Sequence, residues 1–350
     1  MEGKSIPSTW QPTCSLNILR LRSELLKQIR RFFDDRNYTE VETPLLSHDV
    51  VVDTHINPIE VSGVEVTGAN QTSQCTRMFL QTSPEAAMKR LLAAGMGSIY
   101  QITKSFRSSE RGDRHNPEFT IIEWYGVGTD HLQQMRLTED LVRTCIEARY
   151  GLDFLPGETR LDAGPQSFRV LNWDDAFIGV LGESVLGKSR LEIEQLAASR
   201  QIPLPAFSSD DTVDDILNVI LAERIEPALG IEHPVFLTAY PRSQAALART
   251  SENDARVSDR FELYMQGVEI CNGYHELTDV RELAEREVQS NSLRVCHKNR
   301  VLPGAERMGA AMMSGLPACS GVALGFDRLL MLLTGSTRID QVIPFPIERA

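Results

Sequence analysis

The sequence predicts an α+β protein whose helices lie outside an antiparallel β-sheet. Strand-like segments joined by polar loops support this fold class. The regular alternation of strands and helices that a doubly wound parallel sheet requires does not occur in the sequence. The glycine-rich fingerprint G-x-G-x-x-G and the Walker P-loop, which bind nucleotides in parallel folds, are also absent from it.

The N-terminal part predicts a helix followed by extended structure. Apolar residues recur at helical spacing over 15–36, and the helix is expected to stop near Asn37. The segment 41–44, Val-Glu-Thr-Pro, predicts a short extended stretch because proline restricts its own backbone and that of the residue before it. Polar, Val/Thr-rich sequence over 49–76 predicts strands and loops.

A second helix is expected to begin at Ser83, with Ser83 as N-cap and Pro84 in the first turn, and to run through Ala94. The segment 151–230 has few strand signals and several helical windows, so we expect a mainly helical insertion there. The remaining strands are expected over 99–106, 119–125, 235–238 and 261–271, and the remaining helices over 137–149, 190–200, 213–224 and 280–293.

Composition is that of an ordinary globular protein, with 42% hydrophobic and 24% charged residues among 350. The net charge of −12 argues against broad electrostatic capture of nucleic acid. The six cysteines are scattered and form no C-x-x-C pair, which predicts reduced thiols. Neither a signal-peptide core nor an apolar run of roughly 20 residues is present, so we expect a cytoplasmic protein without membrane contact.

Two arginines carry the first signs of a phosphate-binding site. Arg107 follows a predicted strand directly, and its rigid position suits bidentate binding of a phosphate. Arg328 lies where the small-residue run 321–325 opens onto an amphipathic helix, so a backbone that a ligand can approach closely meets a fixed positive charge. Either arginine by itself is also compatible with a structural role.

Two carboxylates supply the complementary signal. Glu269 has apolar neighbours on both sides, which directs its side chain to one face of a strand, and Glu276 follows after a glycine turn. If both return to one cleft, their oxygens suit Mg²⁺ beside substrate phosphates. Together with the arginines they predict a site for a nucleoside triphosphate and magnesium, in which positioning and charge stabilisation do the catalytic work.

Several segments, in order along the chain, resemble the three signature motifs of class II aminoacyl-tRNA synthetases. They are 41–44, 106–119 and 325–328. Within that class, the segments 82–85, 118–125 and 269–277 resemble the lysyl branch. The resemblance spans about residues 15–350 and implies a tail over 1–14 followed by one synthetase-like catalytic domain with an antiparallel sheet.

Lysyl-tRNA synthetases carry an N-terminal OB-fold anticodon-binding domain, for which this sequence leaves no room before residue 15. The chain is therefore identified as a member of the elongation factor P–(R)-β-lysine ligase family, which activates (R)-β-lysine with ATP and transfers it to a lysine of elongation factor P. His275, where synthetases usually have serine, and Ala323, where they usually have glycine, favour this family. The resemblance further implies a homodimer with the segment around Pro44 at the interface, and argues against tRNA as a partner.

The resemblance assigns roles to individual residues. It implies that Arg107 and Arg328 are catalytic, binding the α- and γ-phosphates, and that Glu269 and Glu276 hold Mg²⁺. The remaining ATP-binding residues are Ser109, Glu110, His115, Asn116, Glu269, Ile270 and Gly325, and those around the amino-acid substrate are Ser83, Glu85, Tyr125, Glu276 and Ala323.

One position departs from the family pattern. Ser109 stands where the family usually has a glutamate that contacts adenine, so either Glu110 takes that place or adenine recognition relies on the backbone. Other activities also stay open on the sequence. They are aminoacylation of tRNA or release of free adenylate by a truncated synthetase, a catalytically silent regulator, and an amide synthetase of the asparagine type.

Overall fold

The computed structural model describes residues 10–67, 73–150 and 167–350. The strands of these ranges are β1 (Thr39–Glu40), β2 (Leu46–Ser47), β3 (Glu60–Thr67), β4 (Ser73–Leu80), β5 (Ile99–Phe106), β6 (Glu118–Val127), β7 (Arg169–Asn172), β8 (Val235–Thr238), β9 (Arg260–Met265), β10 (Val268–His275) and β11 (Cys319–Gly325). The α-helices are α1 (Leu16–Asp34), α2 (Glu85–Ala93), α3 (His131–Tyr150), α4 (Trp173–Leu181), α5 (Arg190–Ser199), α6 (Val213–Ile220), α7 (Val280–Cys296), α8 (Glu306–Gly315) and α9 (Phe326–Thr334).

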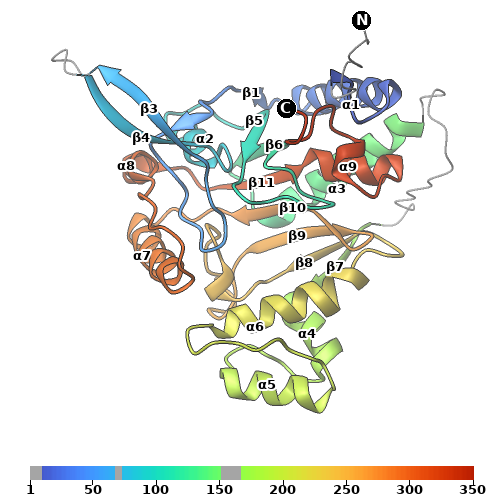
Figure 1. The fold of residues 1–350 in the computed structure, drawn as a ribbon, viewed down its shortest axis with the longest axis vertical. Coiled ribbons are helices and arrows are strands. Elements are labelled where there is room, and N and C mark those ends of the chain that lie inside the picture. The colour runs from blue at the N-terminus through green and yellow to red at the C-terminus, as the bar shows by residue number, and fades with distance from the viewer. Residues whose placement is uncertain (1–9, 68–72, 151–166) are drawn as a thin grey trace, which may run out of the picture.

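An eight-stranded sheet runs through the middle of the protein in the order β1-β5-β6-β11-β10-β9-β8-β7 (Figure 1). The neighbours from β5 to β8 pair antiparallel, whereas β1 and β7 are edge strands that pair parallel with β5 and β8. The predicted α+β class with an antiparallel sheet is therefore confirmed for its six inner strands. A separate sheet, β2-β4-β3, projects from one corner.

Alternation along the inner strands separates a core face from a cavity face. On β6, Ile122 and Trp124 are fully buried in the main hydrophobic core, while Glu123 and Tyr125 line the cavity described below. Helices α1, α3 and α9 supply the rest of that core. The core face thus fixes which side chains of the same strand reach the cavity.

Helix α1 shows how the N-terminal sequence sets the core. Ser15 caps it by accepting a hydrogen bond from the Ile18 N–H, as its residue type favours. Phe33 is fully buried and stacks on Tyr100 of β5, with ring centroids 4.6 Å apart. The helix is followed by Asn37 in the left-handed region, at φ 58°, close to the predicted end.

Other boundaries agree less evenly with the sequence predictions. Strands β5 and β8 have the predicted bounds, and the strand segment predicted over 261–271 around Gly267 is a hairpin of β9 and β10 that extends to His275. Its turn needs positive φ at Gln266 and Gly267, and glutamine gave no such signal. Helix α3 begins at His131 rather than Leu137, and helix α8 was not predicted.

Helices α4, α5 and α6 pack together beyond β8 at the edge of the sheet (Figure 1). Their apolar side chains form a cluster around Trp173 and Phe177 that is distinct from the main core. Strand β7 lies within the range predicted to be mainly helical, because its alternation is too short to read from four residues. The part of that range over 151–166 lies outside the described residues.

None of the helices in the described ranges combines the length and apolar character that a membrane span requires.

Helix α2 begins at Glu85, two residues after the predicted cap, and Ser83 accepts a hydrogen bond from the Glu85 N–H instead of capping in the predicted register. The cysteines whose state the structure gives, Cys14, Cys145, Cys271, Cys296 and Cys319, are free thiols, as predicted.

Replacing Phe33 by alanine should destabilise the fold by about 3–5 kcal/mol, because it removes a fully buried ring between α1 and the sheet. Urea unfolding measures this change. Val288→Ala, on an α7 side chain that is 68% exposed, is the matched control and should change the free energy of unfolding by less than about 0.5 kcal/mol. Equal losses in both variants would contradict the described packing.

Candidate active site

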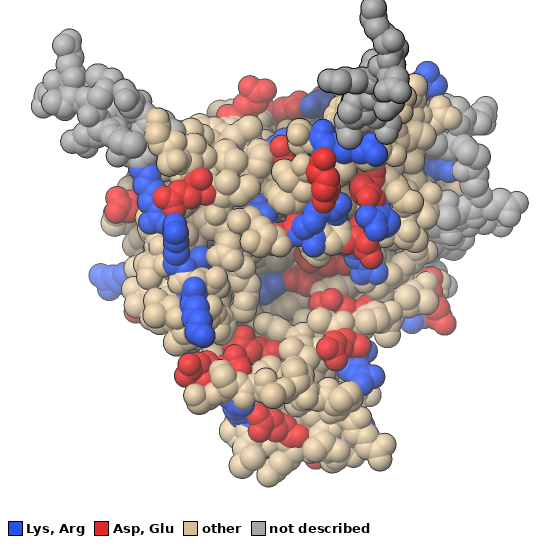
Figure 2. Space-filling model, in the orientation of Figure 1, with Lys and Arg blue, Asp and Glu red and all other residues tan. Residues whose placement is uncertain are grey.

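A cavity of about 390 Å³ opens on the face of the sheet opposite α1, α3 and α9. In Figure 2 it is the hollow near the middle of the molecule, with acidic and basic side chains around it. Of the predicted site residues, only Ser109 is absent from its lining. The others are Ser83, Glu85, Arg107, Glu110, His115, Asn116, Tyr125, Glu269, Ile270, Glu276, Ala323, Gly325 and Arg328.

Arg328 lies in the first turn of α9 and is held from two sides. One terminal nitrogen donates to the Glu269 carboxylate at 3.0 Å and to the Glu269 carbonyl at 3.1 Å, and the other lies 2.6 Å from Nε2 of His115. Burial and Arg328 lower the pKa of His115, so the ring is neutral at neutral pH. Enclosure opposes ionisation of Glu269, but Arg328 and Arg107 outweigh it and lower the pKa of that carboxyl.

Arg107 follows the end of β5, as predicted, and its backbone N–H donates to the Pro117 carbonyl across the hairpin. Its guanidinium lies over the ring of Phe119, 5.1 Å from the centroid, and 3.7 Å from the Glu110 carboxylate. Nε of Arg107 is buried and has no hydrogen-bond partner among the described residues. This guanidinium therefore keeps donors available for a ligand.

The loop between β5 and β6 places Glu110 at the cavity and Ser109 outside it. Ser109 is exposed and has φ 67°, a left-handed conformation that turns its side chain away. Glu110 lines the cavity beside Arg107. Of these two residues, Glu110 is the one placed to reach a ligand in the cavity.

Asn116 and Arg114 anchor this loop. Asn116 is 4% exposed, donates to the Glu118 carbonyl at 2.7 Å and accepts from the Ile347 N–H at 3.1 Å. Arg114 donates to the Gly267 carbonyl at 2.8 Å. These bonds connect the loop to the C-terminal segment and to the β9–β10 turn, so the cavity wall they form is rigid.

Behind the floor of the cavity, a buried lysine lies between two of the carboxylates that line it. Lys89 of α2 lies 2.7 Å from Glu85, four residues before it, and 2.5 Å from Glu276 beyond β10. The two carboxylates raise the pKa of Lys89 in spite of burial, so it stays charged. Burial raises the pKa of Glu276 to about 7, against the lowering effect of Lys89.

Glu123 of β6 is a third carboxylate on this floor. It accepts hydrogen bonds from Ser83 Oγ at 2.7 Å and from the Tyr125 hydroxyl at 2.8 Å. Burial, followed by the charge of Glu85, raises its pKa to about 8. At neutral pH Glu123 is therefore mostly protonated.

Gly321 of β11 makes room for this arrangement. A Cβ at this position would collide with the Tyr125 ring and with the Glu276 carboxylate. By contrast, a Cβ at Gly325 would meet nothing nearer than 3.7 Å. The space beside Gly325 is thus left open in the protein, as expected where a ligand approaches the backbone.

A β-bulge decides which residues of β10 face the cavity. Glu269 and Glu276 are an odd number of positions apart, which on a regular strand would direct them to opposite faces. The register of β10 against β9 shifts between Glu269 and Cys271, so both carboxylates line the cavity. They do not meet, since seven residues of strand separate them by roughly 20 Å.

The two predicted metal ligands are thus paired with different cations, Glu269 with Arg328 and Glu276 with Lys89. A single ion has ligand distances of about 2.1 Å and cannot contact both. Glu262 of β9 is another carboxylate that lines the cavity, and it accepts from the Tyr264 hydroxyl at 2.7 Å. The prediction that Glu269 and Glu276 bind one ion together therefore does not fit the structure, and each carboxylate has to be considered as a metal ligand by itself.

Sequence reasoning missed Lys89, Glu123 and Glu262. Glu123 had a signal, because it alternates with core residues and lies two positions from Tyr125 on the same strand. Lys89 lies four residues after Glu85 on a helix, a spacing typical of an exposed ion pair. Only the fold shows that this pair is buried.

The motifs, the antiparallel sheet and the cavity lined by two arginines are those of a class II synthetase catalytic core. The family model described as "tRNA synthetases class II (D, K and N)" matches residues 11–349 of the chain. The chain therefore belongs to this family.

Within the family, the similar proteins named "Elongation factor P–(R)-beta-lysine ligase" place the chain among those ligases. The relative from Vibrio vulnificus is 40% identical over 341 residues, covering 97% of this chain and 99% of its own length. Those from Salmonella gallinarum and Vibrio cholerae are each 40% identical, covering 98% of this chain and 99% of their own lengths.

The proton on Glu123 should make stability depend on pH. The pKa of Glu123 is about 8 in the folded protein against 4.5 ordinarily, so its stabilisation is full below pH 4.5 and is lost as pH rises through 8. From about pH 5.5 to about pH 8.5, wild type should lose on the order of 3 kcal/mol more than Glu123→Gln. Urea unfolding at both pH values measures this, and parallel losses would contradict the assignment.

Proposed function

We propose that the protein activates (R)-β-lysine with ATP as an aminoacyl-adenylate and transfers it to a lysine side chain of elongation factor P. The observation that carries this proposal is the cavity itself, in which two guanidiniums lie at one part and an acidic floor at another. The acceptor and the amino acid in this proposal are taken from the name of the relatives, elongation factor P–(R)-β-lysine ligase. The acidic floor supplies a physical reason for a substrate with two ammonium groups.

The part of the cavity around Arg107 and Arg328 is the proposed ATP site. Arg107 has unused donors for the α-phosphate, and Arg328 replaces its contacts to Glu269 and His115 with the γ-phosphate. Phe119 presents a ring on which adenine stacks, with Glu110 and Asn116 beside it. Ile270 and the open backbone at Gly325 border the same space.

Members of this class use ATP and a divalent metal, and we propose Mg²⁺ as the ion here. Glu269 is the proposed ligand, since 37% of its side chain is exposed toward the cavity and its carboxylate is ionised. Glu262 lies on the same face and is the second candidate. When bound, the ion would offset charge on the phosphate oxygens during adenylate formation.

The floor is the proposed amino-acid site. The floor has three carboxylates and one nearby cation, those of Glu85, Glu123 and Glu276 against Lys89. An ammonium group of the substrate would neutralise the remaining negative charge. Tyr125 and Ser83 border the same pocket, and Ala323 of β11 forms part of its wall. The substrate carboxylate is then directed toward Arg107 and the α-phosphate.

The reaction follows in two steps. The β-lysine carboxylate attacks the α-phosphorus and pyrophosphate leaves, while Arg107 and Arg328 stabilise the charge on the two phosphate groups. The neutral amine of the acceptor lysine then attacks the acyl carbonyl, an amide bond forms, and AMP leaves. We further propose that the enzyme acts in the cytoplasm as a homodimer, with the segment around Pro44 at the interface.

Arg107→Ala should lower ATP–pyrophosphate exchange by at least about 100-fold, because the α-phosphate loses its only proposed guanidinium partner. Arg111→Ala is the matched control, since Arg111 lies on the same loop but pairs with Glu348 at 2.6 Å. The control should keep near wild-type exchange. Near wild-type exchange in a folded Arg107→Ala protein would refute the proposed role.

Mass spectrometry of elongation factor P tests the overall reaction. With ATP, the acceptor should gain one lysyl mass from (R)-β-lysine and gain it more slowly from α-lysine. Glu276→Gln should raise the KM for the amino acid by at least about tenfold and change the KM for ATP little, because it removes one floor carboxylate. Preference for α-lysine, or transfer to tRNA instead, would favour a synthetase-like enzyme.

A further inference from the structure

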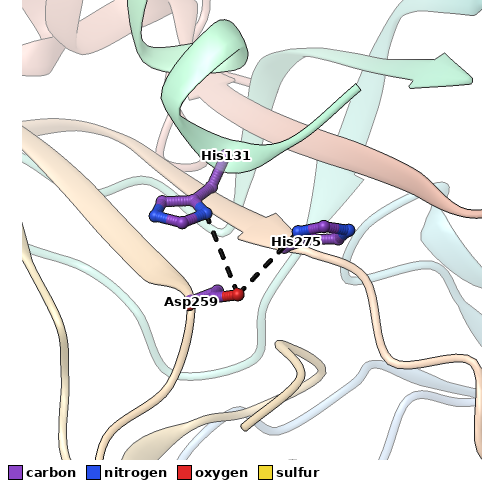
Figure 3. Close-up of side chains that lie close together, drawn as sticks. All are labelled: His131, Asp259 and His275. Carbon is purple, nitrogen blue, oxygen red and sulfur yellow. Dashed lines mark ion pairs between the residues drawn. The ribbon is translucent and has the colours of Figure 1, made fainter. Parts of the chain in front are cut away.

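Two histidines and an aspartate meet on the reverse face of the sheet, behind the cavity floor (Figure 3). His131 is the first residue of α3, Asp259 immediately precedes β9, and His275 is the last residue of β10. None of the three lines the active-site cavity, whereas Tyr274 and Glu276 on either side of His275 do. Strand alternation therefore places this cluster on the opposite side from the proposed chemistry.

The nitrogen atoms that face Asp259 lack hydrogen bonds. Nδ1 of His131 lies 4.0 Å and Nδ1 of His275 lies 3.8 Å from the same Asp259 oxygen, too far for a hydrogen bond. Both nitrogens are buried and have no hydrogen-bond partner among the described residues. Buried ring nitrogens are normally satisfied, so two orphans aimed at one carboxylate indicate a missing ligand.

The backbone around the cluster is fixed independently of the side chains. The His275 N–H donates to the Asp259 carbonyl at 2.8 Å, the Asp259 N–H donates to the Arg249 carbonyl at 3.0 Å, and the Arg249 N–H donates to the His275 carbonyl at 2.8 Å. This closed set of bonds fixes the backbone that carries two of the three side chains. A ligand would therefore find them already positioned.

We propose that His131, Asp259 and His275 form a binding site for one divalent transition-metal ion, of which Zn²⁺ is the best match. Two imidazoles and a carboxylate are a donor set that Zn²⁺ accepts, with bonds of about 2.0–2.2 Å. The ligand atoms lie within 4.8 Å of one another, so contractions of up to about 1.4 Å bring them to the roughly 3.4 Å spacing of a tetrahedral site. Water would supply the fourth position.

The protonation of the two histidines and the charge of Asp259 also favour a metal site. Burial lowers the pKa of His131 and of His275, which keeps the rings in the neutral form that binds a metal. Arg249 donates to Asp259 at 2.8 Å and also to Glu252 at 2.9 Å. Arg249 neutralises the aspartate in the unliganded protein and would share it with the ion.

The ion would connect the start of α3 to the ends of β9 and β10. Because His275 is adjacent to Glu276, the connection would also restrain the strand end that carries the cavity floor. The structural consequence is stabilisation of the folded state, since an ion bound only by the native protein shifts unfolding to higher temperature. The proposal does not require the ion to take part in the reaction.

Equilibrium dialysis of the metal-stripped full-length chain against Zn²⁺ tests the site. Wild type should bind Zn²⁺ with a raised Tm, and His131→Gln/His275→Gln should bind it at least about tenfold more weakly without that rise. The matched control is His297→Ala, which disrupts the second cluster, Asp211, Asp215 and His297, and should keep the effect. Loss of binding in the control but not in the double variant would overturn the proposal.

A second measurement needs no variant and decides the case if the histidine variants fail to fold. Nitrogen-15 NMR of histidine rings in wild type, titrated with Zn²⁺, should shift Nδ1 of two rings at one equivalent, and Cd²⁺ should reproduce the effect through direct metal–nitrogen coupling. Unchanged Nδ1 signals up to several equivalents would refute the site, as would shifts confined to other histidines.

Discussion

The floor of the cavity carries more negative charge than the protein neutralises, and the account of the site depends on this imbalance. Glu85, Glu123 and Glu276 converge where one cation, Lys89, is buried among them. Removing a carboxylate from water opposes its ionisation, so the surplus is held as a proton on Glu123. Under the proposed function, an ammonium group of the substrate replaces that proton, so the pocket is complementary to a diamino acid.

The fold produces this pocket by simple means. Alternation on β6 directs Trp124 into the core and its neighbours Glu123 and Tyr125 into the cavity. The bulge in β10 then brings Glu269 to the same face as Glu276, which directly follows the strand, so that both carboxylates line the cavity. Gly321 leaves the room that Tyr125 and Glu276 occupy.

Much of this was readable from the sequence, and the rest was not for physical reasons. The fold class, strand β5 and the position of Arg107 follow from local pattern, because strand alternation and turn residues are local signals. The bulge is a property of pairing between β9 and β10, which no local pattern shows. Gln266 adopts positive φ although glutamine is not a typical turn residue. The buried pairing of Lys89 depends on Glu276, which lies 187 positions further along the sequence (276 − 89).

The most direct test of the charge imbalance is calorimetry of (R)-β-lysine binding at neutral pH in buffers of different ionisation enthalpy. We predict net release of protons, because the incoming ammonium ionises Glu123 and the protonated fraction of Glu276, whose pKa values are about 8 and about 7. The release should fall to the smaller part from Glu276 in Glu123→Gln and should fade in wild type as pH rises above 8. Binding with no proton release, or with proton uptake, would contradict this prediction.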